Sequence, residues 1–223
     1  MKKVLIAFAL LCTGAVNAQL NTKTSTNINE TSGEIELICT IFVQGSIIPK
    51  LKSDIERSME HLHNFPCNEK IVNLNSSGGH VATAIEVGKL IRLNDYKTIV
   101  AGSNECSSAC GLIFIAGIER TIEVIKRNRY LVNPKFGFHS PTRVISNNES
   151  VCITAQKDST LVDIPFQQFQ IDWYNYAIYM LGREGGINFS KTVFGVKCSD
   201  VLYASPEGLI NTKIATDIKQ RTM

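Results

Sequence analysis

Residues 73–92 read NLNSSGGHVATAIEVGKLIR, and residues 106–117 read CSSACGLIFIAG. In the first stretch an apolar strand leads into a Gly-Gly turn and then into residues with helical spacing. In the second, Ser108 stands where the chain turns into an apolar helix. Strand–helix alternation is typical of an α/β fold with a mostly parallel sheet, whose ligands bind beyond the carboxyl ends of the strands. We therefore expect both turns at one edge of the sheet.

The same alternation extends along the chain on both sides of these turns. We expect strands at 35–43, 70–74, 98–101, 130–132 and 136–138, and helices at 49–62, 81–93, 108–116 and 165–181. The glycines at 182, 185 and 186 are expected to end the last long helix, and Ser205-Pro206-Glu207 opens a short one. The polar residues 142–162 predict a loop or insertion. No internal repeat is visible, so residues 34–223 are interpreted as a single α/β domain.

The bulk composition excludes some classes of partner. The chain has 223 residues, of which 44% are hydrophobic, and a net charge of +3. That charge falls to +1 without residues 1–18, because only Lys2 and Lys3 are lost. This is too near neutral to indicate a nucleic-acid partner. The length is enough for one domain with a sizeable core.

The first residues indicate export. Two lysines precede an apolar segment, and Val16-Asn17-Ala18 supplies small residues at the −3 and −1 sites of a signal peptide, so residues 1–18 are expected to be removed. Cys12 leaves a lipoprotein as the alternative. The style of this segment is bacterial, which predicts a periplasmic or secreted protein without a stable membrane span. Residues 19–33 are rich in Thr, Asn and Ser and predict a flexible leader.

Six cysteines remain after removal of the signal peptide. An even number in an oxidising compartment favours disulfides, although the sequence does not choose among the pairings. A metal site is the rival interpretation, but the chain has no C-x-x-C motif, and we expect neither metal nor organic cofactor. The six cysteines are Cys39, Cys67, Cys106, Cys110, Cys152 and Cys198.

The Gly78-Gly79 pair is a candidate oxyanion site. Two glycines after a strand let the backbone turn sharply and aim N–H groups outward, where they can bind a carbonyl oxygen that becomes negative. The alternative is a tight turn with no catalytic role.

Ser108 is the candidate nucleophile. A side chain at the first turn of a helix feels the positive end of the helix dipole, and the N–H of Ala109 could join the oxyanion site. The alternatives are a capping serine, catalysis by the neighbouring Ser107, or a thiol nucleophile at Cys106 or Cys110. In a secreted chain we expect these two cysteines to form disulfides that fix the turn.

His139, in the segment FGFHSP, is the candidate base, because it follows an apolar strand and precedes Ser-Pro. His80 is a rival beside the Gly turn, whereas His61 and His63 are expected at the surface. A third residue would orient the imidazole. Asp200 is the first choice for that carboxylate, and Asp172 and Asp163 are alternatives.

These segments resemble the Clp-protease proteolytic subunit and its secreted relatives in the ClpP/crotonase superfamily. NSSGG at 75–79 is similar to the family's Asn-Ser-Pro-Gly-Gly turn, with Ser77 in place of proline. SSAC at 107–110 resembles its nucleophile turn and FHSP at 138–141 its base segment, which carries the two roles to Ser108 and His139. YASPE at 203–207 is similar to the segment after the family's acid.

The resemblance implies repeated β-β-α-type units, serine-peptidase activity on peptides or unfolded proteins, and a homo-oligomer. In the family the acid lies at a set distance before the proline that corresponds to Pro206. The same distance leads here to Val196, which is not a carboxylate, so a Ser-His dyad is an alternative to the triad with Asp200. Two other interpretations stay open. One is a non-catalytic binding or scaffold protein on this fold, and the other is a crotonase-like acyl-thioester enzyme, which uses the same oxyanion geometry.

Overall fold

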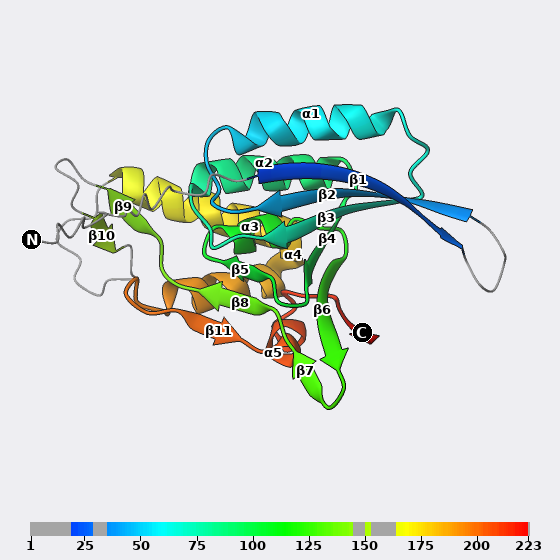
Figure 1. Ribbon diagram of the computed structural model, residues 1–223. Coiled ribbons are helices and arrows are strands. Elements are labelled where there is room, and N and C mark those ends of the chain that lie inside the picture. Colours follow the sequence, from blue (N-terminus) through cyan, green and yellow to red (C-terminus); the bar gives the residue numbers. More distant parts are fainter. Residues whose placement is uncertain (1–18, 29–34, 145–149, 153–163, 223) are drawn as a thin grey trace, which may run out of the picture.

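A computed structural model describes residues 19–28, 35–144, 150–152 and 164–222. Its largest sheet has seven strands in the order β1-β2-β3-β4-β6-β12, with β7 paired to β6 (Figure 1). The β2–β3, β3–β4, β4–β6 and β6–β12 pairs are parallel, and the β1–β2 and β6–β7 pairs are antiparallel. The prediction of an α/β fold with a mostly parallel sheet is confirmed. The strands are β1 (Gln19–Ile28), β2 (Ile35–Gln44), β3 (Glu69–Asn75), β4 (Lys97–Ala101), β6 (Arg120–Arg127), β7 (Tyr130–Val132) and β12 (Asp217–Thr222).

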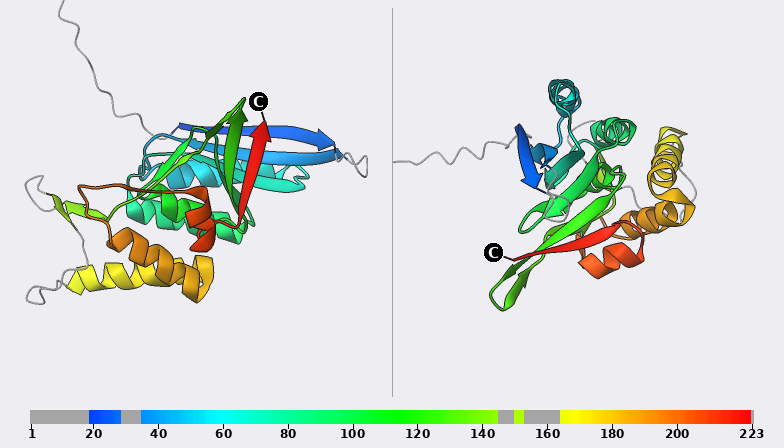
Figure 2. Two further views of the ribbon diagram at one scale, coloured as in Figure 1. Left: turned by 90° about the horizontal axis from the view of Figure 1, so that it is seen from below. Right: turned by 90° about the vertical axis from the view of Figure 1, so that its right-hand side faces the viewer.

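The longer helices gather on one face of this sheet (Figure 2). They are α1 (Leu51–His63), α2 (Val81–Leu93) and α4 (Ile164–Phe194), and the short helices α3 (Cys110–Phe114) and α5 (Pro206–Asn211) complete the set in the described residues. Helix α1 buries the apolar positions that its spacing predicted, at Leu51, Ile55, Met59 and Leu62. The main core therefore lies between the sheet and this helical layer.

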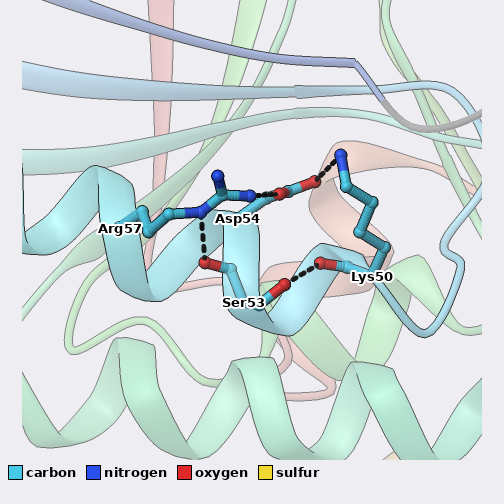
Figure 3. A network of polar contacts seen from close by, with 4 residues as sticks. All are labelled: Lys50, Ser53, Asp54 and Arg57. Atoms are coloured by element: carbon cyan, nitrogen blue, oxygen red, sulfur yellow. Dashed lines mark hydrogen bonds and ion pairs between the residues drawn. The ribbon is translucent and has the colours of Figure 1, made fainter.

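The first turns of α1 carry a small polar network on the solvent side (Figure 3). The Asp54 carboxylate pairs with Lys50 at 3.4 Å and also with Arg57. The Ser53 hydroxyl donates to the Lys50 carbonyl at 2.9 Å, which ties down the start of the helix. Such exposed pairs contribute below about 1 kcal/mol each, so burial of the apolar face is the larger stabilising term for α1.

A second, three-stranded sheet lies beside the first. It has the order β11-β8-β5, from β11 (Leu202–Ala204), β8 (Lys135–Phe138) and β5 (Glu105–Ser107). A parallel bridge between Ser76 and Cys106 joins it to the end of β3. In the region predicted as a loop, β9 (Thr142–Val144) and β10 (Ser150–Cys152) form a short antiparallel hairpin.

A chain of aromatic rings connects the small sheet to α3 and α4. Phe136 of β8 meets Phe114 of α3 edge-on at 4.9 Å between ring centroids, and Phe138 meets Phe189 of α4 at 5.9 Å. Trp173 stacks on Phe189 at 5.9 Å. All five rings are at most 2% exposed. Because edge-to-face and offset contacts between rings are geometrically selective, this cluster fixes how β8 lies over α4.

Two arginines bind the carbonyl groups that follow α3. Arg92 of α2 donates to Ala116 O at 2.7 Å and to Gly117 O at 3.1 Å, and it also reaches Met180 O of α4 at 2.9 Å. Arg120 donates to Gly117 O at 3.1 Å and to Ile214 O at 2.7 Å. Burial, with a smaller contribution from the nearby Arg92 charge, lowers the pKa of Arg120 to about 10. The end of α3 is thus attached to α2, to α4 and to the C-terminal segment.

The structure adds two elements that the sequence did not predict. Residues 19–28 of the predicted leader form β1, which pairs along its whole length with β2, so the backbone of a polar segment is satisfied by an apolar neighbour strand. The predicted end of the long helix at Gly182 is confirmed, because that glycine has a non-helical conformation. A second helical segment, which was not predicted and which contains Gly185 and Gly186, follows directly and continues α4 to Phe194. Gly182 has φ 72° and ψ 172°, a conformation that ends the first helical segment and turns the chain into the second. The predicted signal peptide lies outside the described residues.

Candidate active site

Three strand ends meet at one edge of the molecule. Ser76 follows β3, Ser108 follows β5 and His139 follows β8. Ser107 N–H donates to Ser76 O at 3.0 Å, and Ser108 N–H donates to Gly137 O at 2.9 Å. Because β5 and β8 are parallel and in register from Glu105 with Lys135 onward, Ser108 and His139 leave neighbouring strands in the same direction. The two junctions therefore lie side by side, although β3 and β5 belong to different sheets that the Ser76–Cys106 bridge joins.

The Gly78-Gly79 turn lies directly against the Ser108 turn. A Cβ atom on Gly78 would lie 2.6 Å from Ser108 Cβ and 3.1 Å from Ala109 N, which no side chain tolerates. Gly78 has φ 105° and Gly79 has φ 142°, both in the region that favours glycine. On the other side, Ile47 N–H donates to Gly78 O at 2.8 Å. A Cβ atom on Gly79 would lie 2.3 Å from Ile47 O, so the turn needs both glycines, each for its close approach to neighbouring atoms and for its φ.

The main-chain donors of the two turns differ in availability. Gly78 N–H donates to the Ser76 hydroxyl at 3.1 Å, so it is already satisfied within the turn. The N–H groups of Gly79 and Ala109 donate to no acceptor within the part of the chain that the structure describes. Ser76 was not among the residues singled out from the sequence, although its place in the NSSGG segment was the available signal. Of the three predicted oxyanion residues, Gly79 and Ala109 offer donors and Gly78 offers space.

Ser108 occupies a strained turn between β5 and α3. Its φ is 55°, in the left-handed region, and its residue is half-buried. Sparsely populated backbone conformations of this kind gather at functional sites. The rival Ser107 is buried, and its hydroxyl donates to the Glu105 carboxylate at 2.7 Å. Ser108 is thus the serine of the pair whose hydroxyl is not engaged by a described residue.

A disulfide closes across this turn. Cys106 and Cys110 are bonded to each other, with Cα atoms 5.2 Å apart, and both are fully buried. Cys39 and Cys67 form a second pair in the main domain, and Cys198 is also disulfide-bonded. The alternative of a thiol nucleophile at Cys106 or Cys110 is therefore wrong in this oxidised state, because neither sulfur carries a thiol.

His139 is half-buried at the end of β8, and its ring is held from one side. Its Nδ1 atom lies 2.8 Å from the Ser140 carbonyl oxygen. A carbonyl can only accept, so this contact places the proton of the neutral ring on Nδ1 and leaves Nε2 as an acceptor. His80 has a different task, because its Nδ1 caps α2 by accepting from Thr83 N–H at 3.3 Å. His61 and His63 lie exposed on α1, as predicted.

None of the described carboxylates is bonded to His139. Asp200 is exposed, and its carboxylate accepts from the Ser199 hydroxyl at 3.1 Å. Asp172 of α4 accepts from Gln168 at 2.8 Å. Asp163, the other alternative, lies outside the described residues. The structure therefore brings Gly79, Ala109, Ser108 and His139 to one edge but leaves the acid of the predicted triad unassigned.

No helix in the described segments is long and apolar enough to cross a membrane. In the same residues no group of three or more His, Cys, Asp or Glu side chains is arranged to hold a metal ion.

Comparisons with known proteins show what the chain is similar to in sequence and in fold. No protein-family profile matches the chain. Over 103 residues it is 31% identical to the ATP-dependent Clp protease proteolytic subunit 2 of Pseudomonas aeruginosa, a match that covers 46% of this chain and 48% of that protein. The chain thus spans about half the length of that relative.

Solved structures extend the likeness to most of the chain. ClpP1 from Listeria monocytogenes superposes with a TM-score of 0.57 at 15% identity, over 82% of this chain and 91% of that one. A mutant of the 1510-N membrane-bound stomatin-specific protease, in complex with a substrate peptide, gives 0.56 at 13% identity, over 81% and 73%. Identities this low establish the fold alone.

Proposed function

Because this chain has the ClpP fold and a Clp-subunit-like sequence over about half of its length, we propose that it is a serine peptidase. The observation that carries the proposal is the meeting of three strand ends, which brings a strained serine, a histidine and two unengaged N–H groups to one edge. Such a set supplies the nucleophile, the base and the oxyanion donors of acyl transfer. No metal or organic cofactor enters the proposed chemistry.

The proposed reaction follows from the roles of these atoms. Ser108 Oγ attacks the peptide carbonyl carbon while His139 Nε2 takes the hydroxyl proton. The carbonyl oxygen becomes negative and accepts hydrogen bonds from Gly79 N–H and Ala109 N–H. The carbon–nitrogen bond then breaks, and His139 returns the proton to the leaving amine. Water repeats the sequence on the acyl-enzyme, which restores Ser108 and releases the acid.

The setting of this activity is part of the proposal. Disulfides persist in oxidising compartments, which supports a periplasmic or secreted protein and fits the signal peptide expected from the sequence. The proposed substrate class is a peptide or an unfolded protein segment, from the likeness to the Clp protease proteolytic subunit. A homo-oligomer is proposed from the likeness to Clp subunits.

The test compares serine variants of one turn region. The purified, oxidised protein is assayed for hydrolysis of unfolded-protein and fluorogenic peptide substrates and for labelling by a fluorophosphonate probe. Ser108→Ala should abolish labelling and lower kcat by about 10³-fold or more, since a catalytic nucleophile is lost. Ser103→Ala, at an exposed serine between β4 and β5, is the matched control and should change neither readout.

Two outcomes would sink the proposal. One is hydrolysis that survives Ser108→Ala, and the other is labelling that moves to Ser107. Peptide binding without hydrolysis, unchanged by Ser108→Ala, would instead identify a non-catalytic binding or scaffold protein. The absence of a described carboxylate bonded to His139 is the observation that keeps this second function in view.

A further inference from the structure

We propose that the main-chain carbonyl of Ser140, and not a carboxylate, orients His139, and that Ser140 is the positioning residue of the site. The inference rests on the proposed peptidase function and adds the identity of the third member. In a serine peptidase that member holds the imidazole in the tautomer whose Nε2 can accept the proton of the nucleophile. A neutral oxygen can perform this orienting task, although it brings no negative charge.

The contact between the two neighbouring residues is the first support. His139 Nδ1 and Ser140 O are 2.8 Å apart, a normal hydrogen-bond distance. The acceptor is a main-chain oxygen, so its position depends only on how firmly the 139–141 backbone is held.

That backbone is held by an unusual concentration of bonds on one serine. Ser140 is fully buried, and its N–H donates to Val196 O at 3.1 Å. Its hydroxyl donates to the same oxygen at 2.6 Å and lies 3.3 Å from Val193 O at the end of α4. Pro141 follows, and a proline restricts the residue before it to extended conformations. These constraints fix the direction of the Ser140 carbonyl against the end of α4.

The position of Val196 connects the Ser140 contacts with the acid that the family resemblance predicts. Val196 is where the family spacing counted back from Pro206 expects the acid, and here it is an apolar residue whose carbonyl holds Ser140. The nearest sequence candidate, Asp200, is exposed and accepts from Ser199. The segment that would carry an acid thus acts through its main chain, by anchoring the residue that faces His139.

The experiment tests whether the Ser140 carbonyl or the Asp200 carboxylate orients His139. Ring ¹⁵N NMR of His139 reports the tautomer. The values of kcat and KM on a peptide substrate report how well the site catalyses and binds. Wild-type protein should show the Nδ1–H tautomer. Asp200→Asn should change neither the tautomer nor kcat by more than about 2-fold. Ser140→Ala should mix the tautomers and lower kcat by up to about 10²-fold with KM unchanged, since a small misplacement of a catalytic group has that effect.

Ser190→Ala is the matched control. Ser190 is also a fully buried serine, but its hydroxyl has no partner in the described part of the chain, so its removal should leave tautomer and kcat unchanged. Ser140→Thr keeps the hydroxyl donor and should recover most of the activity if it folds.

Each result decides between the two arrangements. A fall in kcat of about 10³-fold or more in Asp200→Asn, with a change of tautomer, would overturn the inference in favour of the carboxylate. So would a Ser140→Ala protein that keeps the wild-type tautomer and kcat. If wild type hydrolyses nothing, the peptidase proposal fails by itself, while the tautomer measurement still tests the Ser140 contact. If Ser140→Ala does not fold, Asp200→Asn alone still decides.

Discussion

Gly78 and Ser108 approach each other so closely that the smallest side chain would collide. Gly78→Ala would place a methyl group 2.6 Å from Ser108 Cβ and would also force an alanine to φ 105°. We expect this variant to lose fluorophosphonate labelling and nearly all kcat, because relief of the clash moves the nucleophile. Its folded fraction, measured by circular dichroism, should remain substantial because the clash is local.

Gly182→Ala is the control for backbone strain without a clash. Gly182 also has a positive φ, but a Cβ there would meet nothing within 4 Å. The variant should lose about 1–3 kcal/mol of unfolding free energy, the usual cost of a residue in a glycine-only conformation. Its kcat should stay near the wild-type value. Equal loss of kcat in both glycine variants would show that closeness to Ser108 is not the cause.

Single residues also show what the sequence could predict at this scale. Ser108 and Gly79 could be singled out because chemistry and local chain direction coincide at a strand end. Ser140 could not, because its importance comes from Val196, a residue 56 positions away that supplies only a main-chain oxygen. Asp200 was selected by residue type, yet its exposed side chain makes its described hydrogen bond with Ser199. A hydrogen bond to a main-chain oxygen does not depend on the residue type that supplies it, so the sequence does not reveal such a partner.

At the scale of elements, the two described disulfides are expected to do different work. Cys106 and Cys110 are 4 residues apart, so their bond removes little entropy from the unfolded chain, about 2 kcal/mol, whereas the 28-residue separation of Cys39 and Cys67 gives about 3.5 kcal/mol. The short loop instead contains Ser108. Its value is therefore expected in catalysis rather than in stability.

Two double variants test this division. Replacing Cys106 and Cys110 by alanine should lower kcat by up to about 10²-fold with a modest fall in Tm, because the nucleophile turn loosens. Replacing Cys39 and Cys67 should lower Tm more and kcat less. Thermal scans and peptide hydrolysis measure both quantities on the same samples. The reverse ranking would contradict the assignment.

The elements differ in how much of them the sequence revealed. Helix α2 was predicted with its observed bounds, Val81–Leu93, because a Gly turn precedes residues with helical spacing; the cap by His80 is known only from the structure. The edge strand β1 was not, because its polar composition resembles a leader and its structure depends on pairing with β2. The second half of α4 was not predicted either. Gly182 reads as a helix end, and only tertiary packing of Phe189 and Val193 shows that the helix resumes.

On the scale of the whole molecule, Tyr176 links three parts of the fold. It is buried on α4, donates to Leu112 O of α3 at 2.7 Å, and fills the space that Gly88 leaves on α2. Burial raises the pKa of Tyr176 far above its ordinary value, against a smaller lowering by Arg92. The folded state therefore keeps the phenol protonated where the unfolded chain ionises.

The stabilisation from the buried Tyr176 phenol should therefore decrease at alkaline pH. The stabilisation is complete below the unfolded tyrosine pKa of about 10 and is lost as pH rises above it, by about 1.4 kcal/mol per pH unit. Denaturant unfolding of wild type and Tyr176→Phe at several pH values from 9 to 11 measures this. The difference in unfolding free energy between them should be constant below pH 10 and should then shift in favour of the phenylalanine variant. A constant difference up to pH 11 would refute the burial argument.

The overall architecture was the most predictable level, because strand–helix alternation and chain direction limit the topologies that a chain can adopt. The ClpP fold in particular is implied by the resemblance of the NSSGG, SSAC and FHSP segments, and a solved structure at 15% identity confirms it. In the small β11-β8-β5 sheet, β8 was predicted at 136–138, but the three-residue strands β5 and β11 are too short to show a recognisable period.

The hydrogen bonds of the Arg92 guanidinium can transmit distant structural changes to the Ser108 turn. The guanidinium binds Ala116 and Gly117 just beyond α3 and Met180 just before the bend in α4, so it couples mechanically two segments far apart in sequence. A partner or substitution that shifts the second half of α4 must either break these charge-assisted bonds or drag α3 along. Substitutions remote from Ser108 can therefore displace its turn without changing any residue of the proposed site.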